Sequence, residues 1–143
     1  MSKIKFRAWD KEEKQMIYDV QNTYDYGCCN GEGAIEESFK NVLEDNNRYE
    51  VMQFVNLHDI ENKELYTGDI SQDQKGKVFV IYCGEGGFCM CLAKEWNWAT
   101  INGIFPTQFK GLSGMDCGGW FLNEHKIIGN IYENPELIAE EMY

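Results

Sequence analysis

The chain has 143 residues, of which 43% are hydrophobic and 14% aromatic, so it carries enough apolar material for a packed core. Its formal net charge of −11, from 24 acidic and 13 basic residues, opposes non-specific binding to a phosphate backbone. No apolar run approaches the roughly 20 residues that cross a bilayer, and the N-terminal segment lacks the apolar core of a signal peptide, so we expect a cytoplasmic globular protein.

The N-terminal segment predicts a β-hairpin. Residues 4–9 alternate apolar and basic side chains with a period of two, and residues 15–20 have the composition of a returning strand. Lys3, Lys5 and Arg7 could form a small basic ridge for an acidic ligand. We favour the interpretation that they are the solvated face of an edge strand, because charged edges protect a sheet against aggregation.

A helix and a further strand are predicted next. The glycine-rich stretch 24–33 has no period and predicts a loop, and the apolar spacing after it indicates a short amphipathic helix near residues 34–45. Residues 48–55 are rich in β-forming types and predict a strand. His58 beside Asp59 could serve as a base and its orienting group, but adjacent residues in a turn seldom face each other, so we expect an exposed turn histidine.

The stretch 63–70 organises the chain. Polar residues lead into it, Gly68 permits a sharp turn, and a strand segment that starts after the glycine reaches residues 79–82. We therefore expect two units, an N-terminal β unit of residues 1–62 and a C-terminal unit of residues 63–143. The alternative is that the N-terminal and C-terminal segments pack together as one domain.

The downstream half predicts a small antiparallel sheet. Residues 78–82 and 88–92 have the length and composition of strands, and a glycine-rich hairpin loop joins them. Residues 96–101 alternate in polarity, the Asn-Gly pair 102–103 is a strong hairpin signal, and residues 104–105 begin the return. We expect these segments to be arranged as in an SH3-like barrel.

The two tryptophans of the alternating segment would share one strand face. Such a face can stack nucleic-acid bases, but base-stacking proteins surround their aromatic residues with basic ones, and here Lys94 is followed by Glu95. We therefore expect core packing or a contact with a partner. Trp96, Trp98 and Tyr66 are our candidates for an interaction surface.

The C-terminal segment predicts a closing strand and a helix. Residues 120–122 indicate a short strand, and residues 127–132 indicate the closing strand with a bend at Gly129. Asn134 can cap a following helix, and Pro135 suits the first helical position.

The six cysteines predict reduced thiols, because nothing marks the chain for secretion. Their spacing does not match the paired ligands of zinc fingers or ribbons. A metal site built from Cys89, Cys91, Cys117 and His125 can be imagined, but buried thiols account for the same residues. We expect no metal, no cofactor and no catalytic residue.

Three short motifs stand near both ends and in the middle of the chain. They are Ile4 to Lys11 (IKFRAWDK) with Met16; Met52-Gln53-Phe54 with Leu57, Asp59 and Lys63 to Ile70 (KELYTGDI); and Ile128 to Leu137 (IGNIYENPEL). Together they resemble the YopX family of phage and prophage proteins. The resemblance spans the whole chain, although residues 23–47 show nothing that matches.

The middle motif departs from the family at two pairs of residues. Val55-Asn56 stands where the family usually has Thr-Gly, and Glu61-Asn62 stands where it usually has Asn-Gly. Asparagine tolerates the left-handed conformation better than other non-glycine residues, so we expect both turns to be kept. The resemblance implies a mostly β protein of two small β units, encoded by a bacteriophage or prophage, and it carries over no catalytic residue.

We therefore predict a mainly β fold, α+β at most, with a short mid-chain helix and a short C-terminal helix. The preferred function is a non-enzymatic interaction or self-assembly module that binds an unknown protein or forms a homo-oligomer. One alternative is a nucleic-acid-associated factor in phage replication or regulation. Another is an acidic mimic that occupies a host DNA-binding protein.

Overall fold

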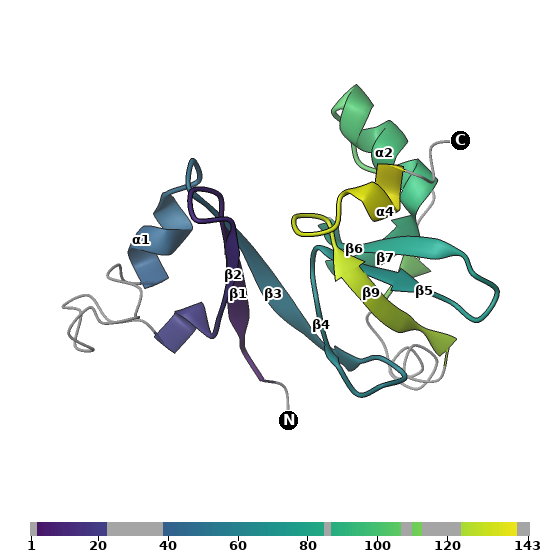
Figure 1. Ribbon diagram of the computed structural model, residues 1–143, viewed down its shortest axis with the longest axis horizontal. Helices are drawn as coiled ribbons and strands as arrows, with labels where there is room; N and C mark the ends of the chain where they lie inside the picture. The colour runs from purple at the N-terminus through teal and green to yellow at the C-terminus, as the bar shows by residue number, and fades with distance from the viewer. Residues whose placement is uncertain (1–2, 23–38, 85–86, 107–109, 113–123, 140–143) are drawn as a thin grey trace. The chain divides into compact units, whose positions relative to one another are not determined.

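The computed structural model describes residues 3–22, 39–84, 87–106, 110–112 and 124–139 (Figure 1). The fold is mainly β, with two antiparallel sheets and a few short helices, as the sequence predicts. The chain divides into two compact units, Met1–Phe54 and Val55–Tyr143, and this division lies upstream of the boundary expected at residue 62.

The first unit is built around a hairpin and a long third strand. Strand β1 (Phe6–Asp10) pairs with β2 (Gln15–Tyr18) on one side and with β3 (Tyr49–His58) on the other, antiparallel in both cases. A short 3-10 helix, η1 (Val20–Asn22), follows β2. A small core packs between these elements and helix α1 (Phe39–Glu44), and its buried members are Ala8, Val20, Val42 and Tyr49.

Helix α1 is the C-terminal part of the helix expected at residues 34–45. Its buried residue, Val42, belongs to the predicted apolar face. Phe39 at its start packs against Phe6 of β1, with ring centroids 5.0 Å apart. The remainder of the expected helix, residues 34–38, lies outside the described residues, as does the expected loop 24–33.

The prediction that β1 is an edge strand is wrong. Strand β1 lies between β2 and β3, so both of its edges are paired, and Arg7 within it is only 4% exposed. Met52, the β3 residue opposite Arg7, is also buried. Lys3 is exposed and Lys5 is half-buried, with its ammonium group 5.6 Å from the centre of the Phe54 ring.

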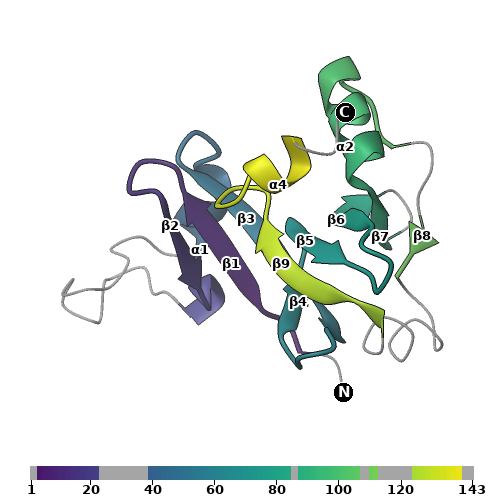
Figure 2. The same cartoon turned by 45° about the vertical axis from the view of Figure 1, so that its right-hand side comes forward.

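The second unit contains a five-stranded antiparallel sheet that curls into a half-barrel (Figures 1 and 2). Strand β4 (Glu64–Tyr66), which precedes this sheet in the chain, pairs with β3. The spatial order of the five strands is β8-β7-β6-β5-β9. Their bounds are β5 (Asp69–Gln72), β6 (Val78–Gly84), β7 (Gly87–Leu92), β8 (Lys110–Gly111) and β9 (Lys126–Asn130).

The half-barrel buries a different cluster on each face. One cluster comprises Val55, Leu65, Ile81, Met90 and Leu112. The other comprises Ile70, Val78, Val80, Ala93 and Ile138, which joins the sheet to helices α2 (Ala93–Asn102) and α4 (Glu136–Ala139). Consecutive residues of β6 contribute to opposite clusters, as the two-residue period of a strand requires.

The segment 96–101 is helical, so the predicted strand and the hairpin turn at 102–103 are wrong. The run Ala93-Lys94-Glu95 consists of strong helix formers, and their propensity extends through the alternating residues that follow. Gly103 adopts a left-handed conformation (φ 66°), and its N–H donates to the carbonyl of Thr100 at 3.2 Å. The Asn-Gly pair therefore ends a helix, since glycine serves helix ends and hairpin turns equally well.

Two hairpins of the second unit use the same turn. Asp59 Oδ1 accepts the N–H groups of Glu61 and Lys63 at 2.9 and 2.8 Å. Asp73 repeats these contacts two strands later with the N–H groups of Lys75 and Lys77, at 3.0 and 2.9 Å. Asp59 is fully buried, and its Oδ2 accepts a third bond from the N–H of Ile127 at 2.8 Å, which ties this turn to β9.

The asparagines at the two departures within the middle motif occupy left-handed positions. Asn56 has φ 68° within β3, and Asn62 has φ 64° in the turn before β4. Gly76 stands at the corresponding place in the second turn with φ 88°. The turn at Asn62 is kept as expected, whereas Asn56 takes the left-handed conformation inside a strand rather than in a turn. Asparagine adopts this conformation at modest cost.

The C-terminal motif forms a compact turn after β9. Asn130 Oδ1 accepts the N–H groups of Tyr132 and Glu133 at 3.0 and 2.8 Å. Asn134 does not cap α4 with its side chain as expected; its Oδ1 accepts the N–H of Asn130 at 3.2 Å. The bend expected in the closing strand is present, since the pairing of β5 with β9 shifts register between the partners of Ile70 and Ser71.

Candidate interaction surface

Helix α2 and the residues after it carry exposed large apolar side chains. The inner side of the helix is buried, with Ala93 and Ala99 only 1% and 2% exposed. The apolar side chains that face solvent lie in its C-terminal half and just beyond, and we call them the α2 surface. They are Trp98 (49% exposed), Ile101 (70%), Ile104 (50%) and Phe105 (59%).

The local backbone places these side chains close together in the chain. Trp98 and Ile101 are three residues apart on the helix, a spacing at which side chains are neighbours. The left-handed Gly103 then reverses the chain, and the N–H of Ile104 donates to the carbonyl of Ala99 at 3.0 Å. Apolar groups gathered in this way are typical of sites that bind other proteins.

The three candidates predicted from the sequence have different environments. Tyr66 lies in β4 and is only 3% exposed. Trp96 is half-buried, and its ring packs against Tyr82 with centroids 5.6 Å apart. Of the three, only Trp98 presents a largely exposed ring, because residues two apart on a helix point in directions about 200° apart rather than to one face.

Trp96 belongs to a buried cluster that joins α2 to the sheet, with Tyr82, Cys89 and Cys91. Burial raises the pKa of the Cys91 thiol from 9.0 to about 12, and Glu95 and Cys89 add to the effect. Burial also raises the pKa of Tyr82. Because the thiolate is the reactive form, Cys91 is poorly suited to act as a nucleophile or metal ligand at neutral pH.

His125 is engaged in the core of the second unit. It is 1% exposed, its Nδ1 lies 3.2 Å from Ser71 Oγ, and its ring meets the edge of Phe79 at 5.2 Å. Within the described residues, no cluster of three or more His, Cys, Asp or Glu side chains could hold a metal. Cys117, a member of the imagined metal site, lies outside these residues.

The polar residues of the first motif also serve the fold. Asp10 Oδ1 accepts the N–H groups of Glu12 and Glu13 at 3.0 and 3.2 Å. Arg48 binds both oxygens of the same carboxylate, at 3.2 and 3.1 Å. Burial alone would raise the pKa of Asp10, but these hydrogen bonds outweigh it and lower the pKa. The motif therefore fixes a hairpin turn and an ion pair.

The predicted strands place Ile101 in one segment and Ile104 and Phe105 in the next, so the sequence pattern does not predict most of the α2 surface. Two signals favour the helix. The helix formers at 93–95 precede the tryptophans, and Gly103 follows at the position where helices commonly end. With the helical period, Trp98 and Ile101 fall on one face without further information.

Comparisons with known proteins support the overall fold. A family model described as YopX protein matches residues 5–139. The crystal structure of protein EF1440 from Enterococcus faecalis is similar, with a TM-score of 0.57 and 22% sequence identity over 96% of this chain and 99% of that chain. At this identity the likeness concerns the fold. No curated protein matches the chain, and none of the helices in its described part could span a membrane.

Proposed function

Because the chain belongs to the YopX family, we propose that it is a bacteriophage- or prophage-encoded protein that acts by binding another protein or a second copy of itself. The proposed site of action is the cytoplasm of the bacterial host. The proposal rests on one observation, the α2 surface. Phage genes on either side of its coding sequence would support the proposed origin.

The α2 surface can supply binding energy because its side chains are largely in water. Burying one large apolar side chain completely contributes about 1.5–3 kcal/mol. Trp98 and Phe105 add aromatic rings, the type of residue that carries much of the energy of protein interfaces. A partner that covers the four side chains therefore gains several favourable contacts within a short segment.

The side chains that could act in catalysis are buried or already engaged in contacts that stabilise the fold. Cys91 is held as a thiol by its raised pKa, and the Ser71–His125 pair is buried in the second unit. Asp59 uses both carboxylate oxygens to bind backbone N–H groups. These observations favour a binding role over an enzymatic one.

Substitution of the α2 surface tests the proposal. We expect the full chain to associate with itself in sedimentation velocity, or to capture a discrete protein from a lysate of phage-infected cells. The double variant Trp98→Asp with Ile101→Asp should weaken that association at least about tenfold, since it places two charges in the contact. Circular dichroism should show that the variant remains folded.

Ile60→Asp is the matched control. Ile60 is 50% exposed, lies in the same unit and belongs to the turn before β4. This variant should associate as the unmodified chain does. A chain that stays monomeric and captures nothing above background, or an association that the α2 variant leaves unchanged, would refute the proposed function.

A further inference from the structure

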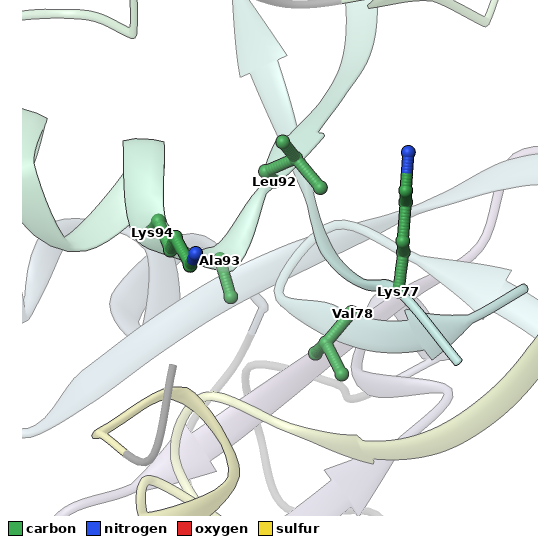
Figure 3. A pocket seen from close by; sticks show the side chains of 5 residues that line it. All are labelled: Lys77, Val78, Leu92, Ala93 and Lys94. Carbon is green, nitrogen blue, oxygen red and sulfur yellow. The ribbon is translucent and has the colours of Figure 1, made fainter. Parts of the chain in front are cut away.

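The second unit has a small pocket beside the start of helix α2. Its volume is about 160 Å³, and Figure 3 shows the side chains that line it. Three of them are apolar and two are lysines: Val78, Leu92 and Ala93, with Lys77 and Lys94. Val78 and Ala93 are buried, whereas both lysines are exposed.

We propose that the partner of the α2 surface inserts an acidic side chain into this pocket, between Lys77 and Lys94, and lays an adjacent apolar residue on Trp98. The inference rests on the proposed function and specifies the chemistry of the partner. It commits to a protein segment in which a carboxylate and an aromatic or aliphatic side chain lie close in sequence.

The two lysines are available to such a carboxylate. Neither ammonium group forms an ion pair or hydrogen bond with the described part of the chain. The neighbouring carboxylate of Asp73 is engaged, because its Oδ1 accepts backbone N–H groups of its own turn.

One lysine of the pocket shares a face of helix α2 with one residue of the α2 surface. Lys94 and Trp98 are both exposed and stand four residues apart, so they share one face of the helix. That spacing corresponds to about 6 Å along the helix axis. An extended peptide advances about 3.3 Å per residue, so a carboxylate two positions from an apolar side chain spans the same distance.

The two lysines of the pocket favour a partner that places an acidic side chain there, because opposite charges attract. The chain carries 24 acidic and 13 basic residues, so most of its surface repels a carboxylate. A pair of uncompensated lysines beside an apolar surface offers such a group a local attraction. The partner's carboxylate would thus fix its orientation on the α2 surface, which is the usual contribution of charge at an interface.

A pair of blocked peptides tests the inference on the full chain. One peptide carries a glutamate two positions from a phenylalanine, and the other has glutamine in place of the glutamate. In heteronuclear NMR, the glutamate peptide should shift the amides of residues 77, 78, 93 and 94 together with the Trp98 indole N–H. It should bind about fivefold more tightly than the glutamine peptide, and added salt should remove the difference.

Lysine variants supply the control. Lys77→Gln with Lys94→Gln should bring both peptides to the same affinity, whereas Lys75→Gln, an exposed lysine of the neighbouring turn, should preserve the difference. Equal binding of the two peptides to the unmodified chain would overturn the inference while leaving the proposed function intact. So would an absence of shifts at the pocket in a chain whose association depends on Trp98. Loss of both the peptide shifts and the association would overturn both proposals.

Discussion

At the scale of single residues, we expect Asp59 to contribute more to the free energy of unfolding than its place in a turn suggests. Its carboxylate is fully buried and accepts three backbone N–H groups, one of them from Ile127. Asp59→Ala would leave these donors without their acceptor. We expect the free energy of unfolding to fall by about 3 kcal/mol, measured by urea denaturation.

The second turn provides the control for this prediction. Asp73 makes the same two local contacts from a partly exposed position, where water can replace the lost acceptor. Asp73→Ala should therefore cost less than about 1 kcal/mol. Equal losses in the two variants would show that the bond to Ile127 and the burial of Asp59 contribute little.

Gly129 is required because a side chain occupies the space beside it. A Cβ added there would lie 2.5 Å from Asn134 Oδ1, and that oxygen already accepts the N–H of Asn130. Gly129→Ala should lower the free energy of unfolding by about 1–3 kcal/mol. Gly111→Ala, at a site with open space around the added carbon, should cost less.

The partner of Gly129 can be identified by a double-mutant cycle. If the clash with Asn134 is the cause, Asn134→Ala should make Gly129→Ala less costly than it is in the unmodified chain. Strictly additive losses would contradict this explanation. The cycle would also show why the terminal Ile-Gly-Asn-Ile-Tyr-Glu-Asn motif contains both residues.

At the scale of elements, a strand can be predicted from the sequence where the pattern of apolar residues favours a strand over a helix. The continuous apolar run at 78–82 has the length and the β-branched and aromatic composition of a buried strand, and it forms part of β6. The segment 96–101 has a composition compatible with either a strand or a helix. Its outcome follows from residues outside the segment, the helix formers at 93–95 and Gly103 at the helix end, and the burial of Ala93 and Ala99 in the core of the second unit adds tertiary support.

The burial of Cys91 in the cluster that joins α2 to the sheet should make the free energy of unfolding change with pH in the alkaline range. Burial raises the pKa of Cys91 from 9.0 to about 12, so well below pH 9 the thiol is protonated in both the folded and unfolded states. Between these values the unfolded thiol ionises while the folded one keeps its proton. Because the unfolded state then binds fewer protons, stability falls as the pH rises.

Chemical denaturation from pH 8.5 to 10.5 measures this effect. Tyr82 contributes in the same direction, since burial also raises its pKa. Cys91→Val should therefore reduce the loss of stability with rising pH but not abolish it. Cys83→Val, which changes an exposed thiol, is the control and should keep the full dependence. An unchanged slope in the Cys91 variant would show that this thiol ionises as readily in the folded protein.

At the scale of the whole molecule, the sequence was informative about class and motifs and less so about surface. The two units and the mainly β fold follow from turns and strand periods distributed along the chain. Whether a side chain is exposed depends on which elements pack against it, so the sequence suggests Tyr66 as a surface residue although Tyr66 is buried in the structure. The lysines of the pocket lie 17 positions apart in the sequence, so no local pattern indicates that they line one pocket.

The net charge of −11 separates the proposed function from a nucleic-acid-binding role. Binding to a phosphate backbone draws on clustered Lys and Arg and the release of counterions, which this composition opposes. In gel-shift assays at low ionic strength, we expect no binding of single- or double-stranded DNA tighter than about 10⁻⁴ M. A salt-sensitive shift abolished by Trp98→Ala would contradict this, because Trp98 would then be stacking bases rather than contacting a protein.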